Sequence, residues 1–370
     1  MAKLPELCEI QYGYAFDSAC FTENNTCLPL VRIRDVKRGY SETFYSGNYP
    51  SDYVIDSGSL LVGMDGEFNI ARWKGGHALL NQRVCKITAK EDVNEEYIRF
   101  ALSKALKKIE NRTAFVTVKH LSAKELNQLE IDVPNYTTQT DIAKVLTQIE
   151  SIISARQRQF QKLDELVKAR FIELFGDPVY NSKRLPIQRL CKLGSLDRGR
   201  SQHRPRNDPK LLNGPYPLIQ TGEVASAGLY ITKYKNTYSE LGLRQSKMWS
   251  AGALCITIAA NIAQTAILTF DACFPDSVVG FLPNDSINAI YMHYWFGFFQ
   301  KILEKQAPQV AQKNINLKIL SELNVIVPTQ EKQEQFAAFV EQTDKSKVAI
   351  QKALDEAQLL FDSLMQKYFG

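Results

Sequence analysis

Residues 126–134 read LNQLEIDVP, and residues 320–328 read LSELNVIVP. Sliding the chain against itself by 194 positions aligns the two halves without a gap from about residue 58 to residue 176. Within this span, SGSLLVGM at 57–64 matches AGALCITI at 251–258, each a small-residue turn followed by an apolar strand pattern. Self-similarity on this scale predicts one fold that is present twice.

The N-terminal parts of the two copies match at a different offset. KLPELCEI at 3–10 corresponds to RLPIQRLCKL at 184–193, and LPLVRIRD at 28–35 corresponds to YPLIQTGE at 216–223. The copies therefore differ there in loop length and loop chemistry, the features that vary most readily in a fold. The two copies share the sequence of their structural elements but differ in their loops, which predicts one fold that reads two different targets.

Each copy ends in a long run with residues at heptad spacing, from 142 to 174 and from 336 to 368. A single run of this kind is usually ordinary bundle packing, but two copies in the same register, each after a globular unit, favour a coiled coil. The simplest arrangement pairs the two helices antiparallel within the chain. The expected seam consists of Ile142, Leu146, Ile149, Ile153, Arg156, Phe160, Leu163, Val167, Arg170 and Leu174, and of Phe336, Val340, Thr343, Lys347, Ile350, Leu354, Ala357, Phe361, Leu364 and Tyr368.

Composition favours two cores and an anionic partner. The chain has 370 residues and 42.0 kDa, and its 45% apolar content is enough to bury two separate cores. The net charge is only +5, yet residues 183–210 carry nine Lys or Arg against two Asp. A local basic stretch of this kind is typical of nucleic-acid binding.

The cysteines and apolar runs indicate a cytoplasmic protein. No two of the seven cysteines have the two-to-four-residue spacing of a zinc site, so we expect reduced thiols packed as small apolar groups and no bound metal. The N-terminal stretch MAKLPELCEI lacks the apolar core of a secretory signal. The run at 251–268 has the length of a membrane span, but Asn261 and Gln264 inside it favour two buried strands.

These features together resemble the DNA-specificity subunit of type I restriction-modification systems, over essentially the whole chain. The most specific marks are the repeated block ending in IDVP or VIVP and followed by QTDIAKVL or KQEQFAAF, then GSLLVGMDGEFNI with ALLNQRVCKI, and ACFPDSVVGF. The resemblance implies a non-catalytic subunit that binds double-stranded DNA at a split recognition site and docks methyltransferase and restriction/translocase subunits. It also implies that S-adenosylmethionine and ATP bind only to those partners, so no cofactor is expected on this chain.

The resemblance and the repeat predict an α+β fold. Two globular target-recognition domains form an internal repeat, each is followed by a long helix, and the two helices pair as an antiparallel coiled coil. The expected divisions are target-recognition domain 1 at 1–136, spacer helix 1 at 137–176, a linker at 177–183, target-recognition domain 2 at 184–329 and spacer helix 2 at 330–370.

The second copy offers a basic loop, RGRSQHRPRND at 198–208. Gly199 and Pro205 restrict the loop, and its arginines supply forked donors next to smaller polar groups. Arg pairs bidentately with guanine and Asn with adenine, while cations also hold phosphates. A solvated basic loop is the alternative. The candidate DNA-binding residues are Arg198, Arg200, Ser201, His203, Arg204, Arg206 and Asn207.

The first copy differs at the corresponding loop, QYGYAFDSACF at 11–21, which carries no Arg. Its cations come from VRIRDVKRG at 31–39, and two tyrosines are candidates for contact with sugar or base. The candidate residues here are Tyr12, Tyr14, Arg32, Arg34, Lys37 and Arg38.

Two further sets occupy matching positions in the copies. The turn MDGEFN at 64–69 and its counterpart IAANIAQ at 258–264 present polar groups that fit either a DNA groove or a structural turn with buried amides. Lys and a polar residue recur at 119–120 and 313–314, which favours phosphate contact; a solvated loop is the alternative for either pair. These candidates are Asp65, Asn69, Asn261, Gln264, Lys119, His120, Lys313 and Asn314.

The sequence lacks the motifs of a methyltransferase, a nuclease or a phosphate-binding enzyme. DPVY at 177–180 lacks the second proline of an amino-methyltransferase loop, and no GxxxxGKS phosphate loop or acidic nuclease cluster is present. Two hypotheses remain: a non-catalytic reader of bipartite DNA, or a coiled-coil protein scaffold without sequence-specific reading. The arginine cluster at 198–206 favours the reader, because a scaffold has no use for four forked cations on one loop.

Overall fold

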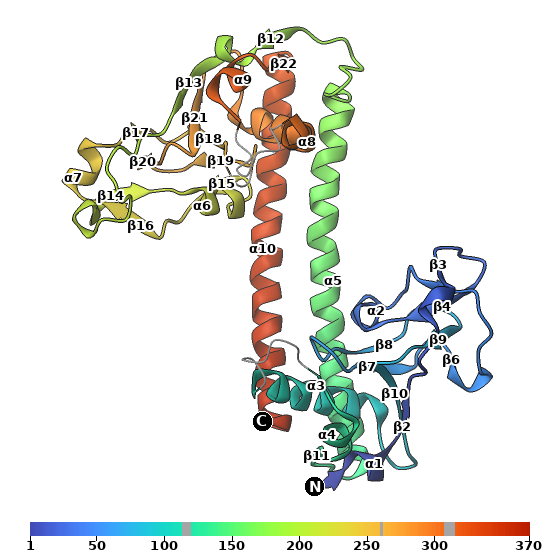
Figure 1. Cartoon of the computed structure of the whole chain (residues 1–370). Helices are drawn as coiled ribbons and strands as arrows, with labels where there is room; N and C mark the ends of the chain where they lie inside the picture. The colour runs from blue at the N-terminus through green and yellow to red at the C-terminus, as the bar shows by residue number, and fades with distance from the viewer. Residues whose placement is uncertain (113–119, 260–261, 307–314) are drawn as a thin grey trace. The chain divides into compact units, whose positions relative to one another are not determined.

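The computed structural model describes residues 1–112, 120–259, 262–306 and 315–370, and the chain forms two compact units (Figure 1). Unit 1 comprises Met1–Gln157 and Lys352–Gly370, and unit 2 comprises Arg158–Gln351. Each unit combines small sheets with helices, so the predicted α+β class is confirmed. The domain divisions expected from the sequence stay a prediction.

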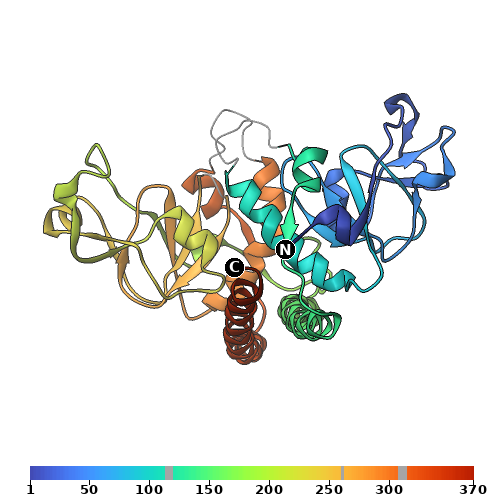
Figure 2. The same cartoon turned by 90° about the horizontal axis from the view of Figure 1, so that it is seen from below.

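Unit 1 contains a four-stranded antiparallel sheet in the order β2-β10-β7-β8 and a five-stranded sheet in the order β3-β5-β4-β9-β6. Helix α3 packs on β8 and β10, as Figures 1 and 2 show. The strands are β1 (Ala2–Lys3), β2 (Cys8–Tyr12), β3 (Phe21–Thr22), β4 (Leu28–Val31), β5 (Phe44–Tyr45), β6 (Val54–Ile55), β7 (Leu60–Gly63), β8 (Ile70–Arg72), β9 (Ala78–Leu80), β10 (Val84–Ala89) and β11 (Glu130–Ile131). The short helices are α1 (Leu4–Leu7), α2 (Ile33–Arg38) and α4 (Ala123–Asn127), and α3 spans Glu95–Arg112.

Unit 2 repeats this plan with a five-stranded sheet in the order β13-β21-β18-β19-β15 and a four-stranded sheet in the order β16-β14-β20-β17. The strands are β12 (Ile187–Arg189), β13 (Gly194–Arg198), β14 (Leu212–Leu218), β15 (Tyr230–Ile231), β16 (Asn236–Tyr238), β17 (Met248–Trp249), β18 (Leu254–Thr257), β19 (Thr265–Leu268), β20 (Ala272–Cys273), β21 (Val278–Pro283) and β22 (Asn324–Ile326). The helices are α6 (Thr221–Ser226), α7 (Glu240–Arg244), α8 (Ala289–Gln306) and α9 (Leu317–Ser321).

Strand registers confirm the repeat. In unit 1, Leu30 of β4 pairs in parallel with Leu79 of β9, and in unit 2 Leu218 of β14 pairs in parallel with Cys273 of β20. Cys273 is the residue 194 positions after Leu79. The same correspondence links the antiparallel pairs Tyr12–Cys85 and Arg198–Val279 in the other sheet. The two copies therefore share strand pairing as well as sequence.

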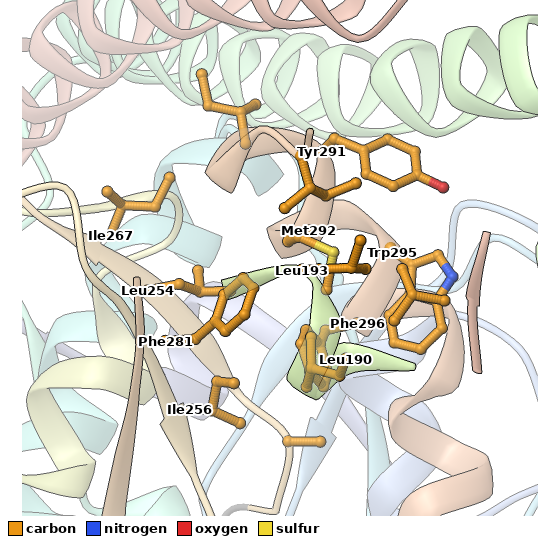
Figure 3. Packing of buried hydrophobic residues seen from close by; sticks show 14 of the residues in the cluster. Leu190, Leu193, Leu254, Ile256, Ile267, Phe281, Tyr291, Met292, Trp295 and Phe296 are labelled. Atoms are coloured by element: carbon orange, nitrogen blue, oxygen red, sulfur yellow. The ribbon is translucent and has the colours of Figure 1, made fainter. Parts of the chain in front are cut away.

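The core of unit 2 lies where α8 covers the five-stranded sheet (Figure 3). Leu254 and Phe281 from the sheet pack in one cluster with Tyr291 and Trp295 from α8, and all four side chains are fully buried. The apolar run at 251–268 forms β18 and β19, as expected, rather than a membrane span. Across the described ranges no helix has both the length and the apolarity needed to cross a bilayer.

The two 40-residue helices α5 (Tyr136–Phe175) and α10 (Gln330–Phe369) follow the globular parts of the two copies. Each predicted seam position is buried or half-buried, whereas Val348 and Leu359 off the seam are 65% and 72% exposed. Within unit 2, α5 and α10 pair antiparallel, because Asp164 contacts Lys347 and the later Phe171 contacts the earlier Phe336. The heptad prediction is confirmed.

Candidate DNA interface

A close backbone approach positions the basic loop of unit 2. The Gly199 N–H donates to the Val278 carbonyl oxygen at 2.9 Å, and a Cβ at Gly199 would lie 2.2 Å from the Phe274 carbonyl oxygen. Only glycine fits at that distance. Arg198 and Arg200, on either side of it, are exposed.

Asp276 holds three of the loop's arginines. The Arg198 Nε donates to the Asp276 carbonyl oxygen at 2.8 Å, and the Arg206 Nη2 donates to Asp276 Oδ1 at 2.6 Å. Arg204 Nη2 lies 3.8 Å from Asp276 Oδ2, and the Arg204 Nη1 also donates to the carbonyl oxygens of Ser201 and His203. These contacts give the loop a defined shape. Asp276 was missed in the sequence, although it lies in the ACFPDSVVGF motif.

Two carboxylates, Asp197 next to the loop and Asp208 at its end, have lowered pKa values. The pKa of Asp197 lies below its usual value, first because Lys247 donates a hydrogen bond to it and then because of the Arg198 N–H and the charges of Lys247 and Arg200. The pKa of Asp208 is also lowered, by the Lys210 N–H and by its 3.0 Å contact with His203. Both carboxylates therefore offset part of the positive charge at neutral pH.

Arg200 is the arginine of this loop best placed to meet a ligand. Its side chain is exposed, and no hydrogen bond or ion pair of its guanidinium is found among the residues that the structure describes. Its backbone is fixed, because its N–H donates to the Phe274 carbonyl oxygen at 3.1 Å and its carbonyl oxygen accepts from the Ser246 hydroxyl at 3.0 Å. A free cation on a fixed backbone suits recognition of an anion or of a base edge.

We expect Arg200→Ala to weaken binding of the target duplex by about 1–3 kcal/mol if this residue reads a base. A residue that contacts phosphate alone would instead lower affinity evenly for all sequences and reduce the salt dependence. Titrations of the assembled complex against target and scrambled duplexes at several salt concentrations separate these results. Arg189→Ala on β12, an exposed arginine outside the loop, is the matched control. Unchanged affinity and unchanged salt slope would make the loop a solvated surface.

Below the basic loop lies a hollow of about 420 Å³ with a mixed polar and apolar lining. Ser201 is only 6% exposed there, and its hydroxyl has no hydrogen-bond partner within the described residues. Ser201 is thus at the wall of the hollow rather than on the open surface. The lining residues are Ser201, Arg206, Asn207, Leu212, Leu218, Gln220, Thr221, Asn236, Tyr238, Pro275 and Ser277.

In unit 1, Tyr12 and Tyr14 occupy the positions of Arg198 and Arg200. The Gly13 N–H donates to Val84 at 2.9 Å and the Tyr14 N–H donates to Leu80 at 2.9 Å, repeating the backbone pattern around Gly199. The Tyr12 hydroxyl donates to Asn127 Oδ1 at 3.0 Å, and burial raises the pKa of this tyrosine. Tyr14 is 42% exposed and is the one of the pair that faces solvent.

The cations of α2 in unit 1 are mostly engaged. Arg34 donates to the Thr43 hydroxyl at 3.0 Å and lies 3.6 Å from Asp35, Lys37 lies 3.7 Å from Glu67, and Arg38 lies 3.7 Å from Glu42. Exposed Arg32 has no ion pair in the described part of the chain.

Asp65 and His120, predicted from separate segments, lie together in unit 1. His120 Nδ1 is 2.5 Å from Asp65 Oδ1, and Arg83 joins them at 3.6 Å from Asp65 Oδ2 and 3.2 Å from the His120 ring. Arg83 was missed in the sequence, where its one signal was its place in the ALLNQRVCKI motif. Its φ of 68° is rare for a non-glycine residue, as at many functional sites. Asn69 donates from its side chain to the Glu67 carbonyl oxygen at 3.3 Å in the neighbouring turn.

Gln264 belongs to a different part of unit 2. It lines a hollow of about 970 Å³ together with Phe160 and Asp164 of α5, His293 of α8 and Lys347 of α10, none of which belongs to the basic loop. The structure therefore does not bring Gln264 together with the arginines. The remaining candidates Lys119, Asn261, Lys313 and Asn314 lie outside the described residues.

Comparisons with known proteins agree on one family. The family described as type I restriction modification DNA specificity domain matches residues 1–165 and 190–358. The type I restriction enzyme EcoBI specificity subunit of Escherichia coli is 27% identical over 401 residues, covering 99% of this chain and 84% of that protein.

Solved structures show the same fold. The S subunit of a type I restriction-modification system from M. genitalium superposes with a TM-score of 0.64 at 14% identity, covering 100% of this chain and 95% of that one. A chain from a study of complex assembly and conformational transition of the type I R-M system gives a TM-score of 0.56 at 16% identity, covering 100% and 96%.

Proposed function

Because the chain belongs to the family of type I restriction-modification DNA specificity subunits, we propose that it reads a bipartite DNA target with one unit per half-site. Subunits of this family are non-catalytic, so methyl transfer and DNA cleavage fall to partner subunits. In this proposal the chain docks methyltransferase and restriction/translocase subunits, and S-adenosylmethionine and ATP bind to those partners.

The observation that carries the proposal is that equivalent backbone positions in the two units carry different side chains. Gly13 and Gly199 make equivalent hydrogen bonds, to Val84 of β10 and Val278 of β21, yet the next residue is Tyr14 in unit 1 and Arg200 in unit 2. A protein that bound DNA only through phosphates would gain from keeping the cation in both places, since phosphate contacts carry no sequence information. Divergence at a fixed position instead fits two readers of different sequences.

In this proposal, contacts with phosphates provide affinity and contacts with base edges provide sequence specificity. Exposed Arg200 and exposed Arg32 would contact phosphates or base edges, while the tethered loop of unit 2 would limit the entropy lost when DNA binds. Asp276 contributes to this tethering, because it contacts Arg198, Arg204 and Arg206.

The test is the set of methylated bases in a host that carries this chain with its cognate modification and restriction subunits. Single-molecule sequencing should find one split motif with a fixed spacer, lost when this chain is deleted. Gel shifts of the assembled methyltransferase should show the same preference for that duplex. A complex that assembles but binds all duplexes alike would favour the protein scaffold instead.

A further inference from the structure

Arg32 in unit 1 and Gln220 in unit 2 occupy equivalent positions, just after the strand that pairs in parallel with β9 or β20. Arg32 lies two residues after Leu30, and Gln220 lies two residues after Leu218. The Arg32 N–H donates to Asp35 Oδ2 at 3.0 Å, and the Gln220 N–H donates to Glu223 Oε2 at 3.2 Å. Both side chains are exposed. Backbone and local hydrogen bonding thus agree, and only the side chain changes.

In unit 2, Gln220 lies at the wall of the hollow beneath the basic loop. Gln220 lines it with two other amides, Asn207 and Asn236, and with Ser277. The Ser201 hydroxyl at the wall is buried without a hydrogen-bond partner in the described residues. An unpaired buried hydroxyl is costly, so this hollow is built for a polar group that comes from outside.

In unit 1 the place of Ser277 is taken by Arg83, 194 positions earlier. Asp65 and His120 hold its guanidinium, as described above. Unit 1 therefore has Arg32 and Arg83 where unit 2 has Gln220 and Ser277. At these two corresponding positions, uncharged donors and acceptors in unit 2 are replaced by arginines in unit 1.

We propose that Arg32 and Gln220 are corresponding base-reading residues: Arg32 reads guanine in one half-site and Gln220 reads adenine in the other. This inference rests on the proposed function. Arg is matched to the O6 and N7 acceptors of guanine, and Gln to the N6 donor and N7 acceptor of adenine. Arg and Gln side chains are both long and end in a planar group that can form two hydrogen bonds with one base. The same backbone position can therefore present either residue to its base. A phosphate site would not accept an uncharged Gln equally well.

The experiment is reciprocal exchange, Gln220→Arg and Arg32→Gln, each in the complex with its cognate modification subunit. We expect Gln220→Arg to change one A·T pair of a single half-site toward G·C, and Arg32→Gln to change one G·C pair of the other half-site toward A·T. Affinity for the original duplex should fall roughly tenfold to hundredfold in each case. Methylated-base sequencing and binding titrations provide the two readouts.

Matched controls are Gln188→Arg on β12 and Arg112→Gln at the end of α3, two exposed positions with the same charge changes. Both should leave the motif and the affinity unchanged. If an exchange variant does not assemble, Gln220→Ala and Arg32→Ala replace it, and each should relax the same base position.

The outcomes separate the two proposals. A wild-type complex without a split motif contradicts the proposed function itself. A wild-type split motif that both exchange variants retain, or an affinity that falls equally for every sequence, overturns only the assignment of Arg32 and Gln220.

Discussion

Exchanging residues 184–328 for the matching segment of a relative with a known target should replace one half of the recognition sequence and leave the other half intact. The basic loop, its Asp276 anchor and the polar hollow all lie within this segment. The reading groups of unit 1 lie outside it. The expected effect is therefore a complete change of specificity in one half-site, larger than any single substitution can give.

The exchange must preserve the contact with the long helices. Tyr291 stacks on Phe171 with 5.4 Å between ring centroids, so a donor segment has to supply an aromatic residue at that place. Methylated-base sequencing of the chimeric complex gives the readout, and the reciprocal exchange of residues 1–134 is the matched control. Two half-sites that changed together would contradict the assignment of one unit to each half.

Truncating Phe171 on α5 should cost unit 2 about 3–5 kcal/mol of stability, the range for removing a buried aromatic ring. Phe171 is 0% exposed. Its ring centroid lies 4.9 Å from those of Phe175 and Phe298 and 5.4 Å from those of Tyr291 and Phe336. Phe171→Ala removes contacts with two other helices, α8 and α10, and leaves a cavity between them and α5.

Hydrogen exchange of unit 2 amides is the suitable measurement, because two units need not unfold in one step. Leu166→Ala on the same helix is the control. Leu166 is 49% exposed, so its truncation should change stability by no more than about 0.5 kcal/mol. A loss below 1 kcal/mol for Phe171→Ala would mean that α5 is not part of the core of unit 2.

The repeat and the long helices were predictable because both are periodic. A shift of 194 residues matches Leu79 to Cys273, and those residues pair with equivalent strands. Phe171 lay outside the predicted seam, although it contacts Phe336 of α10, because its other partners Tyr291 and Phe298 lie on α8, which a two-helix heptad pattern does not describe. Its burial depends on a third element that the pattern does not contain.

The candidate site was predicted less completely, since its contacts join residues that are far apart in sequence. Arg206 pairs with Asp276 across 70 residues, and Tyr12 reaches Asn127 across 115. The basic loop was visible from composition, but nothing in its own sequence indicated that Asp276 would hold it. Ser201 was expected as a donor or acceptor on the loop, but it is buried at the wall of a hollow that residues of β14 and β16 also line.

The discontinuity of unit 1 has a consequence for how the protein is made. Residues 1–157 need 352–370 to complete their core, in which Met365 of α10 is buried with Leu146 of α5. A ribosome that adds about 5–20 residues per second needs roughly 10 to 40 s to pass from one segment to the other. During that interval the nascent chain exposes the apolar face of α5 that α10 later covers. Unit 1, although its first residues are synthesised first, is therefore the last to be completed, and this face of α5 stays uncovered until residues 352–370 have been translated.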